Sequence, residues 1–233
     1  MTMSGALDLL NTNINKEYME SGKYTNSKGI PVPRVTSIIS SMLHTDALLY
    51  WANNLGFKGI RYKDAIRKAA DIGTEAHFRI ECFLKDKLKC DDNIPYLGFA
   101  MWYDNITGNG NTIELVASER TVVCDYFGGT FDALLRINGA YYLIDFKTSN
   151  HVSYKYFLQL AAYKYMLELE GTYLQGVIVL QLDKEEVGFN EYLLDFSIPN
   201  HRDFMNACTE GFFSLVYAYY RTKEAEARYN NIF

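Results

Sequence analysis

The stretch GTFDALLRINGAYYLIDFKTS, residues 129–149, decides the expected fold. Within it, Asn138-Gly139 separates two runs of aliphatic, β-branched and aromatic residues, which is the pattern of a β-hairpin with a two-residue type I′ turn. Because a two-residue turn fixes the register of its two strands, we expect Asp132 to face Asp145. The hairpin is therefore expected to bring two carboxylates together at its open end.

Side chains alternate along a strand, so the hairpin has two different faces. One face is expected to be core, because nearly all of its residues are apolar: Phe131, Ala133, Leu135, Ile137, Ala140, Tyr142, Ile144 and Phe146. The other face collects polar and charged residues: Thr130, Asp132, Arg136, Asp145 and Lys147. Any chemistry of the hairpin is expected on this second face.

The carboxylates of the second face indicate a cation site. Directly opposed residues have Cβ atoms about 5 Å apart, and two carboxylates at that separation repel by about 3 kcal/mol in a medium of intermediate dielectric constant. Mg²⁺ or Mn²⁺ would relieve this repulsion, since both ions accept oxygen ligands. Lys147 would lie on the same face, where an ammonium can orient a water molecule and offset phosphate charge. The alternatives are that Asp132 and Asp145 are solvated strand-end charges and that Lys147 forms a salt bridge with one of them.

The rest of the chain alternates between helical and strand-like patterns. Helices are expected over residues 36–43, 46–55, 61–88, 153–169 and 202–229, and Gly171 is placed to end the fourth of these. Strands are expected over residues 114–124, 128–137, 140–147, 174–182 and 188–196, and residues 105–112 are expected to form a loop. A mixed α/β domain follows from this order of elements.

The composition is that of a globular chain, with 48% hydrophobic and 22% charged residues among 233. This length is enough for one domain that buries roughly 70% of the surface of its unfolded chain. We expect residues 1–30, which are polar and rich in asparagine, to be poorly ordered or loosely docked, and residues 31–233 to form that single domain. The net charge of −5 argues against a protein that coats nucleic acid with its whole surface.

The sequence also predicts a location. No apolar run approaches the roughly 18 residues that span a bilayer, and the start of the chain, MTMSGALDLLNTNINK, has neither the basic residues nor the apolar segment of a secretory signal. The cysteines form no CxxC pair, so free thiols in a reducing cytoplasm are expected rather than disulfides or a zinc site. We therefore expect a cytoplasmic protein without a membrane partner.

The pattern Asp132 followed by Asp145-Phe146-Lys147 resembles the core motif of the PD-(D/E)XK nucleases, and GTFD with IDFKTS resembles their RecB-like branch. The resemblance implies a restriction-endonuclease-like fold, in which helices flank a mixed β-sheet. It also implies that Asp132, Asp145 and the carbonyl of Phe146 bind Mg²⁺ or Mn²⁺, and that Lys147 is the catalytic lysine.

Two further motifs carry the same resemblance. LQLAAYKYM resembles the QxxxY motif, which lies beside the site and touches DNA; Gln159 and Tyr163 would share one face of a helix, with Lys155 one turn earlier. GTEAHFRIECFL, residues 73–84, resembles the GTxxH helix, in which the histidine, here His77, is a further metal ligand. Taken alone, the tyrosine could be a core aromatic and the histidine a structural residue.

Three less specific features lie upstream of the hairpin. Glu119 stands where RecB-like enzymes often carry an acidic residue, so it is either a site member or a surface charge of a strand. IPVPRVTSIISSML followed by ALLYWANNLG resembles a segment of mitochondrial genome maintenance exonucleases and their phage relatives, with Arg34 in place of a serine. A basic stretch forms either a solvated helix face or a track for phosphates: Lys58, Arg61, Lys63, Arg67 and Lys68.

The resemblance thus implies a metal-dependent DNA exonuclease of recombination, repair or replication, which acts on single strands or DNA ends in a bacterial or phage-infected cell. A recombination or replication protein is a candidate partner, and the candidate substrate-binding residues are Arg61, Lys155, Gln159 and Tyr163. No iron–sulfur cluster is expected, because only Cys208 lies in the C-terminal region where cluster-bearing relatives carry several cysteines. The alternatives are a nuclease-fold module that binds DNA without cutting it and an end-processing endonuclease subunit of a larger complex.

Overall fold

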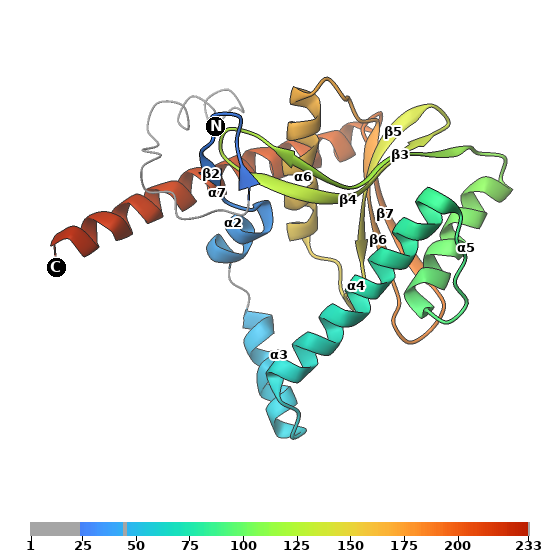
Figure 1. Cartoon of the computed structure of the whole chain (residues 1–233), viewed down its shortest axis with the longest axis horizontal. Coiled ribbons are helices and arrows are strands. Elements are labelled where there is room, and N and C mark those ends of the chain that lie inside the picture. Colours follow the sequence, from blue (N-terminus) through green and yellow to red (C-terminus); the bar gives the residue numbers. More distant parts are fainter. Residues whose placement is uncertain (1–23, 44–45, 233) are drawn as a thin grey trace.

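The computed structural model describes residues 24–43 and 46–232. Its main feature is a five-stranded β-sheet with the strand order β3-β4-β5-β6-β7, flanked by helices (Figure 1). Neighbouring strands are antiparallel except β5 and β6, which are parallel and are connected through α6. The protein therefore has the mixed α/β fold that the sequence predicts.

Most elements lie where the sequence predicts them. The helices are α2 (Val35–Met42), α3 (Asp46–Phe57), α4 (Tyr62–Asp86), α5 (Ile94–Gly108), α6 (Tyr154–Leu169) and α7 (Pro199–Ile232). The strands of the sheet are β3 (Ile113–Val123), β4 (Gly128–Ile137), β5 (Ala140–Lys147), β6 (Gly176–Leu182) and β7 (Phe189–Asp195). The hairpin turn has the predicted left-handed backbone, with φ of 50° at Asn138 and 83° at Gly139. Among the described helices, none has an apolar stretch long enough to cross a membrane.

Helix α5 differs from the prediction, which assigns residues 105–112 to a loop. The helix begins after Asn93, whose side chain accepts a hydrogen bond from a backbone N–H of the first turn, and Pro95 occupies that turn. At the other end, the amide of Asn109 donates to the carbonyl oxygen of Asn105 at 2.8 Å. The segment predicted as a loop thus contains the last turn of α5, which extends to Gly108, and its C-cap, Asn109.

Part of the polar N-terminal segment forms a short hairpin that contacts β4. β1 (Tyr24–Thr25) pairs with β2 (Pro31–Val32) in antiparallel orientation. The buried side chain of Asn26 accepts hydrogen bonds from backbone N–H groups of the turn, and Lys28 pairs with Asp125 at 2.6 Å. Residues 1–23 lie outside the described part of the chain.

Helices cover both faces of the sheet, so both faces belong to the core. Helices α4 and α5 pack on one face, and α2, α6 and α7 pack on the other (Figure 1). The face predicted to be polar is therefore buried, at Leu134 and Leu143 for example. Phe131 also lies on this face, against Tyr163, although strict alternation assigns it to the opposite one. The alternation is interrupted at the neighbouring residue, Asp132.

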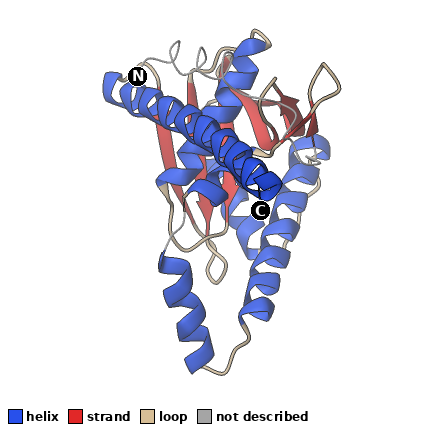
Figure 2. Ribbon diagram, turned by 90° about the vertical axis from the view of Figure 1, so that its left-hand side faces the viewer, coloured by secondary structure: helices blue, strands red, loops and turns tan. Residues whose placement is uncertain are grey.

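Helix α3 and the first half of α4, residues 46–72, form a helical arm. The arm extends away from the sheet and its covering helices (Figures 1 and 2). Helix α3 packs chiefly against α4, and large side chains of the arm, such as Tyr50 and Phe57, are exposed. Because α4 continues from the arm to the sheet, it connects this exposed surface with the core of the protein.

Candidate active site

The two strands of the central hairpin separate at the predicted site. Their ladder follows the predicted register up to the pair Ala133–Ile144 and ends there, so Asp132 and Asp145 are not a ladder pair. Asp132 spans the gap instead, because its Oδ2 accepts a hydrogen bond of 2.7 Å from the backbone N–H of Phe146. The carboxylate of β4 is therefore held by the backbone of β5.

The second carboxylate, Asp145, lies in the interior beside Lys147. Asp145 is 2% exposed, and its Oδ2 lies 2.6 Å from Nζ of Lys147. The ammonium of Lys147 also lies over the ring of Tyr156 in α6, 4.9 Å from the ring centroid. Strand β5 thus carries an enclosed ion pair of the two residues that the sequence predicts to be catalytic.

Helix α4 brings His77 to the end of the hairpin. Its Nε2 lies 3.0 Å from the carbonyl oxygen of Phe146, and because a carbonyl oxygen only accepts, Nε2 donates the hydrogen bond. The other ring nitrogen, Nδ1, lies 3.5 Å from Oδ1 of Asp132 and 3.8 Å from Oε1 of Glu119. The Phe146 carbonyl, a metal ligand by family resemblance, here orients the imidazole.

Glu119 reaches the site from an irregular position in β3. Its φ is 47°, in the left-handed region that residues other than glycine rarely adopt. The β3–β4 ladder skips the rung that holds Glu119 and Asp132, although the rungs on both sides are formed. This break accompanies the interrupted alternation at Phe131 and leaves both carboxylates next to His77. Backbone strain of this kind is concentrated at functional sites.

The carboxylates around these residues make the electrostatic potential of the site negative. Burial acts to lower the pKa of His77, but Glu119 and Asp132 outweigh it and raise the pKa above its ordinary value. Burial likewise acts to lower the pKa of Lys147, and Asp145 and Asp132 raise it overall. Burial raises the pKa of Asp145 to about 6, an effect that Lys147 opposes and Asp132 reinforces. A site that retains protons in this way also attracts a divalent cation.

The donor atoms present fit such a cation. Nδ1 of His77 and carboxylate oxygens of Glu119 and Asp132 all lie within 4.8 Å of one another. Nδ1 bears a free lone pair when Nε2 holds the proton, and a backbone carbonyl on the second ring nitrogen is the usual support of a metal-binding histidine. Oδ2 of Asp145 is buried, and its one partner among the described residues is the ammonium of Lys147 at 2.6 Å. The mixed oxygen and nitrogen set favours Mn²⁺ over Mg²⁺, which prefers oxygen alone.

The expected QxxxY motif lies on one face of α6, where the amide of Gln159 donates to the hydroxyl of Tyr163 at 3.4 Å. Tyr163 is 3% exposed, and it lies so close under β4 that a Cβ at Gly129 would be 2.5 Å from its ring. Burial raises the pKa of Tyr163, so its hydroxyl stays protonated. In this structure Tyr163 packs against β4, the strand that carries Asp132, and its side chain is too buried to contact DNA.

The two basic residues expected to bind substrate have partners other than His77, Glu119 and Asp132. Lys155, at the start of α6, donates to the carbonyl oxygen of Leu43 at 2.5 Å and so caps the C-terminal end of α2. Arg61 precedes α4 on the arm and pairs with Asp64 at 2.7 Å. The Arg61 side chain is 84% exposed, so a phosphate can reach it, whereas Lys155 already serves the fold.

Three residues near the site are not predicted from the sequence: Tyr156, Ser149 and Gln181. The hydroxyl of Tyr156 donates to Oγ of Ser149 at 3.1 Å, and the amide of Gln181 donates to the carbonyl oxygen of Ser149 at 2.7 Å. Together they hold the loop that follows Lys147. A signal exists for Gln181, because it is the one polar residue in the apolar strand GVIVLQL and a buried polar group needs a partner.

No family model and no curated protein matches the chain. Among solved structures, that of SSO0001 is similar over 91% of this chain and 83% of its own length, with 15% sequence identity and a TM-score of 0.38. A likeness at this score carries no argument about activity, so a functional assignment rests on the geometry of the site.

Proposed function

We propose that the protein is a metal-dependent DNA exonuclease with a restriction-endonuclease-like fold. The observation that supports this most strongly is the convergence of His77, Glu119 and Asp132 next to the enclosed pair of Asp145 and Lys147. Carboxylates, an imidazole and an ammonium at one point are the groups that hydrolysis of a phosphodiester with a divalent cation requires.

Each group has a separate task in this proposal. A divalent cation held by His77, Glu119 and Asp132, with Asp145 beside it, would polarise the phosphate and lower the pKa of the attacking water. The attacking water gives up a proton to solvent as its oxygen bonds to phosphorus. The bond between phosphorus and the ester oxygen breaks, and the leaving oxygen takes up a proton from solvent. Lys147 is protonated, because nearby carboxylates raise its pKa. It therefore donates a hydrogen bond to the water or to a phosphate oxygen and offsets the charge of the transition state, rather than acting as a base.

The helical arm supports a single-stranded substrate. Tyr50 and Phe57 are exposed, and the basic residues at positions 58–68 lie on the same arm. Aromatic faces stack on unpaired bases, and basic side chains bind phosphates. Helix α4 carries Lys63 near its start and His77 further along. A DNA strand that followed this helix would therefore pass from the arm to the candidate metal site.

The test is the degradation of linear and covalently closed circular single-stranded DNA, in equal amounts, with Mn²⁺ or Mg²⁺. We expect only the linear DNA to be lost, no loss with a chelator, and a loss about 10²- to 10³-fold slower with Lys147→Ala. Asp203→Asn, an exposed change on α7, should behave as wild type. Comparable loss of the circles would identify an endonuclease, and failure to cut either DNA would favour a module that only binds DNA.

A further inference from the structure

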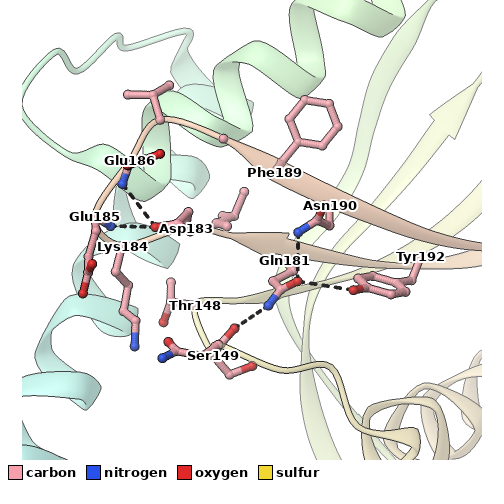
Figure 3. Close-up of a pocket in the computed structure, with 14 residues that line it drawn as sticks. Thr148, Ser149, Gln181, Asp183, Lys184, Glu185, Glu186, Phe189, Asn190 and Tyr192 are labelled. Atoms are coloured by element: carbon pink, nitrogen blue, oxygen red, sulfur yellow. Dashed lines mark hydrogen bonds between the residues drawn. The ribbon is translucent and has the colours of Figure 1, made fainter.

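A polar cavity of about 670 Å³ opens at the carboxyl ends of β5 and β6 (Figure 3). The loop of residues 148–150, which directly follows Lys147, forms one side, and the β6–β7 hairpin at residues 183–188 forms the other. The carboxyl ends of parallel strands are where ligands usually bind in α/β sheets. The cavity volume is within the roughly 300–1,000 Å³ of small-ligand sites.

The wall of the cavity carries an ordered set of neutral hydrogen-bonding groups. The amide oxygen of Gln181 accepts a hydrogen bond from the Asn190 amide at 3.2 Å and lies 3.4 Å from the Tyr192 hydroxyl. Figure 3 shows these three side chains together on the two strands. Asn190 retains a free amide oxygen and a second N–H, and its side chain is exposed. The cavity therefore presents a donor and an acceptor side by side, which matches the edge of a nucleobase.

The loop of residues 148–150 lies between the cavity and the candidate active site. Tyr156 contacts both sides of this junction, since its ring lies under the ammonium of Lys147 and its hydroxyl donates to Ser149. On the side of α4, the loop is so close that a Cβ at Gly73 would lie 3.4 Å from Oγ1 of Thr148. The loop thus has the cavity on one side and α4, the helix that carries His77, on the other.

The rim of the cavity is acidic, with three carboxylates and one ammonium between residues 183 and 186. The carboxylate of Asp183 accepts hydrogen bonds from the backbone N–H groups of Glu185 and Glu186, at 2.7 and 3.1 Å, and so fixes the tip of the hairpin. Figure 3 shows Lys184 directed toward the loop at Thr148. A phosphate on the loop side would meet this ammonium, whereas a phosphate chain crossing the rim would meet the carboxylates.

We propose that this cavity receives the terminal nucleoside of a DNA strand whose adjoining phosphate lies at the candidate metal site of His77, Glu119 and Asp132. The inference rests on the proposed nuclease function and adds to it the residues that select a strand end. A nucleoside is neutral and its base offers hydrogen-bond donors and acceptors, so it fits the cavity wall. The carboxylates of the rim would repel the phosphates of a DNA strand that continued past the cavity. This repulsion is a physical reason for cutting at ends.

The test is a binding measurement in the absence of divalent cations, so that no DNA is cut. The probes are fluorescent single-stranded oligonucleotides that lack one base at the 5′ end, at the 3′ end or in the middle. We expect loss of the base at one end to weaken binding by wild type about tenfold, the effect of one or two hydrogen bonds. In Asn190→Ala this end effect should disappear, while the effect of the missing middle base should stay the same.

Asn105→Ala is the matched control, because Asn105 is an exposed asparagine of α5, and it should keep the full end effect. An end effect of the same size in Asn190→Ala, or none in wild type, overturns the proposal. The rim has its own test: the double change Glu185→Gln and Glu186→Gln should increase the affinity for closed circles relative to linear DNA, and an unchanged ratio contradicts the role of the rim.

The outcomes separate this proposal from the nuclease function. End-dependent binding by a protein that cuts no DNA would refute the nuclease function and leave the cavity assignment standing. Cutting of linear DNA without any end-base effect would do the reverse. The end at which the missing base matters also gives the polarity of degradation.

Discussion

The wall of the candidate site, formed by Asp145, Lys147 and Tyr163, and the helical arm differ in how far their side chains are buried. Asp145 and Tyr163 in the wall are 2% and 3% exposed, whereas Tyr50 and Phe57 on the arm are 71% and 83% exposed. Asp145 has a fixed partner in Lys147, while α3 of the arm packs chiefly against α4 alone. The core thus holds the reacting groups in place. The arm, which is not part of the core, provides the surface that we expect to contact the DNA strand. Changes in the wall should lower turnover and stability, and truncation of exposed side chains on the arm should weaken substrate binding without lowering either.

The largest effect is expected from Lys147→Ala. The variant loses the ammonium that offsets charge on the phosphate, so kcat should fall by about 10² to 10³. Single-turnover cleavage of end-labelled DNA with saturating Mn²⁺ measures this, after circular dichroism has confirmed the fold. Lys63→Ala on the arm is the contrasting variant and should change KM only. A Lys147→Ala protein with normal kcat would remove the lysine from the catalytic set.

The pH dependence of stability should reveal the burial of Asp145. Burial raises its pKa to about 6, compared with about 3.9 in an unfolded chain. The folded protein holds this proton more tightly than the unfolded chain does. The contribution of Asp145 to stability is therefore fully present below about pH 4 and is lost as the pH rises to about 6.

The measurement is the free energy of unfolding of Asp145→Asn minus that of wild type, without metal. We expect this difference to increase between about pH 4 and 6, by at most about 3 kcal/mol. Mn²⁺ should reduce the difference because it stabilises the ionised carboxylate. Asp203→Asn is the control and should show no such trend, and a flat difference for Asp145→Asn would contradict the assigned burial.

A pair of glycine variants compares the packing of the two regions. A Cβ at Gly129 would lie 2.5 Å from the Tyr163 ring, whereas nothing lies within 4 Å of a Cβ at Gly56 in α3. Gly129→Ala should therefore destabilise the protein by about 1–3 kcal/mol. Gly56→Ala should be neutral or stabilise it by about 0.5–1 kcal/mol, as expected in a helix. Urea unfolding measures both, and equal effects would contradict the difference in packing.

The smallest effect is expected on the arm. Tyr50→Ala removes an exposed aromatic face, so the Kd for single-stranded DNA should rise about tenfold without a change in kcat or melting temperature. Tyr173→Ala is the matched control, since this tyrosine is 72% exposed and follows α6 rather than lying on the arm. An equal effect of both variants would show that the arm has no special role in binding.

The regular part of the fold is predictable from the sequence because its signals are local. Asn138-Gly139 sets the hairpin, and the left-handed Gly171 follows the end of α6 as expected. The missed helix α5 also has a local signal, Asn93 followed by Pro95, which the polar residues after Tyr103 obscure. Helix signals at its N-terminal end are sufficient to place it, and the composition at its other end is misleading.

The candidate site is less predictable because it depends on contacts between distant residues. The Phe146 carbonyl has a hydrogen bond to His77, 69 positions away, and the Asp132 carboxylate accepts from the Phe146 backbone. The break of the ladder at Glu119 and Asp132 moves Phe131 to the other face. Spacing predicts which residues gather but not an irregular rung, since alternation assumes a regular strand.

Titration calorimetry with Mn²⁺ tests whether His77, Glu119 and Asp132 form a metal centre. We predict that wild type and Asp203→Asn bind Mn²⁺ with the same affinity and gain thermal stability from it. Asp132→Asn, which keeps the size of the side chain but removes its charge, should bind at least about tenfold more weakly. Wild type that binds no Mn²⁺, or Asp132→Asn that binds it unchanged, would contradict the metal centre and with it the proposed activity.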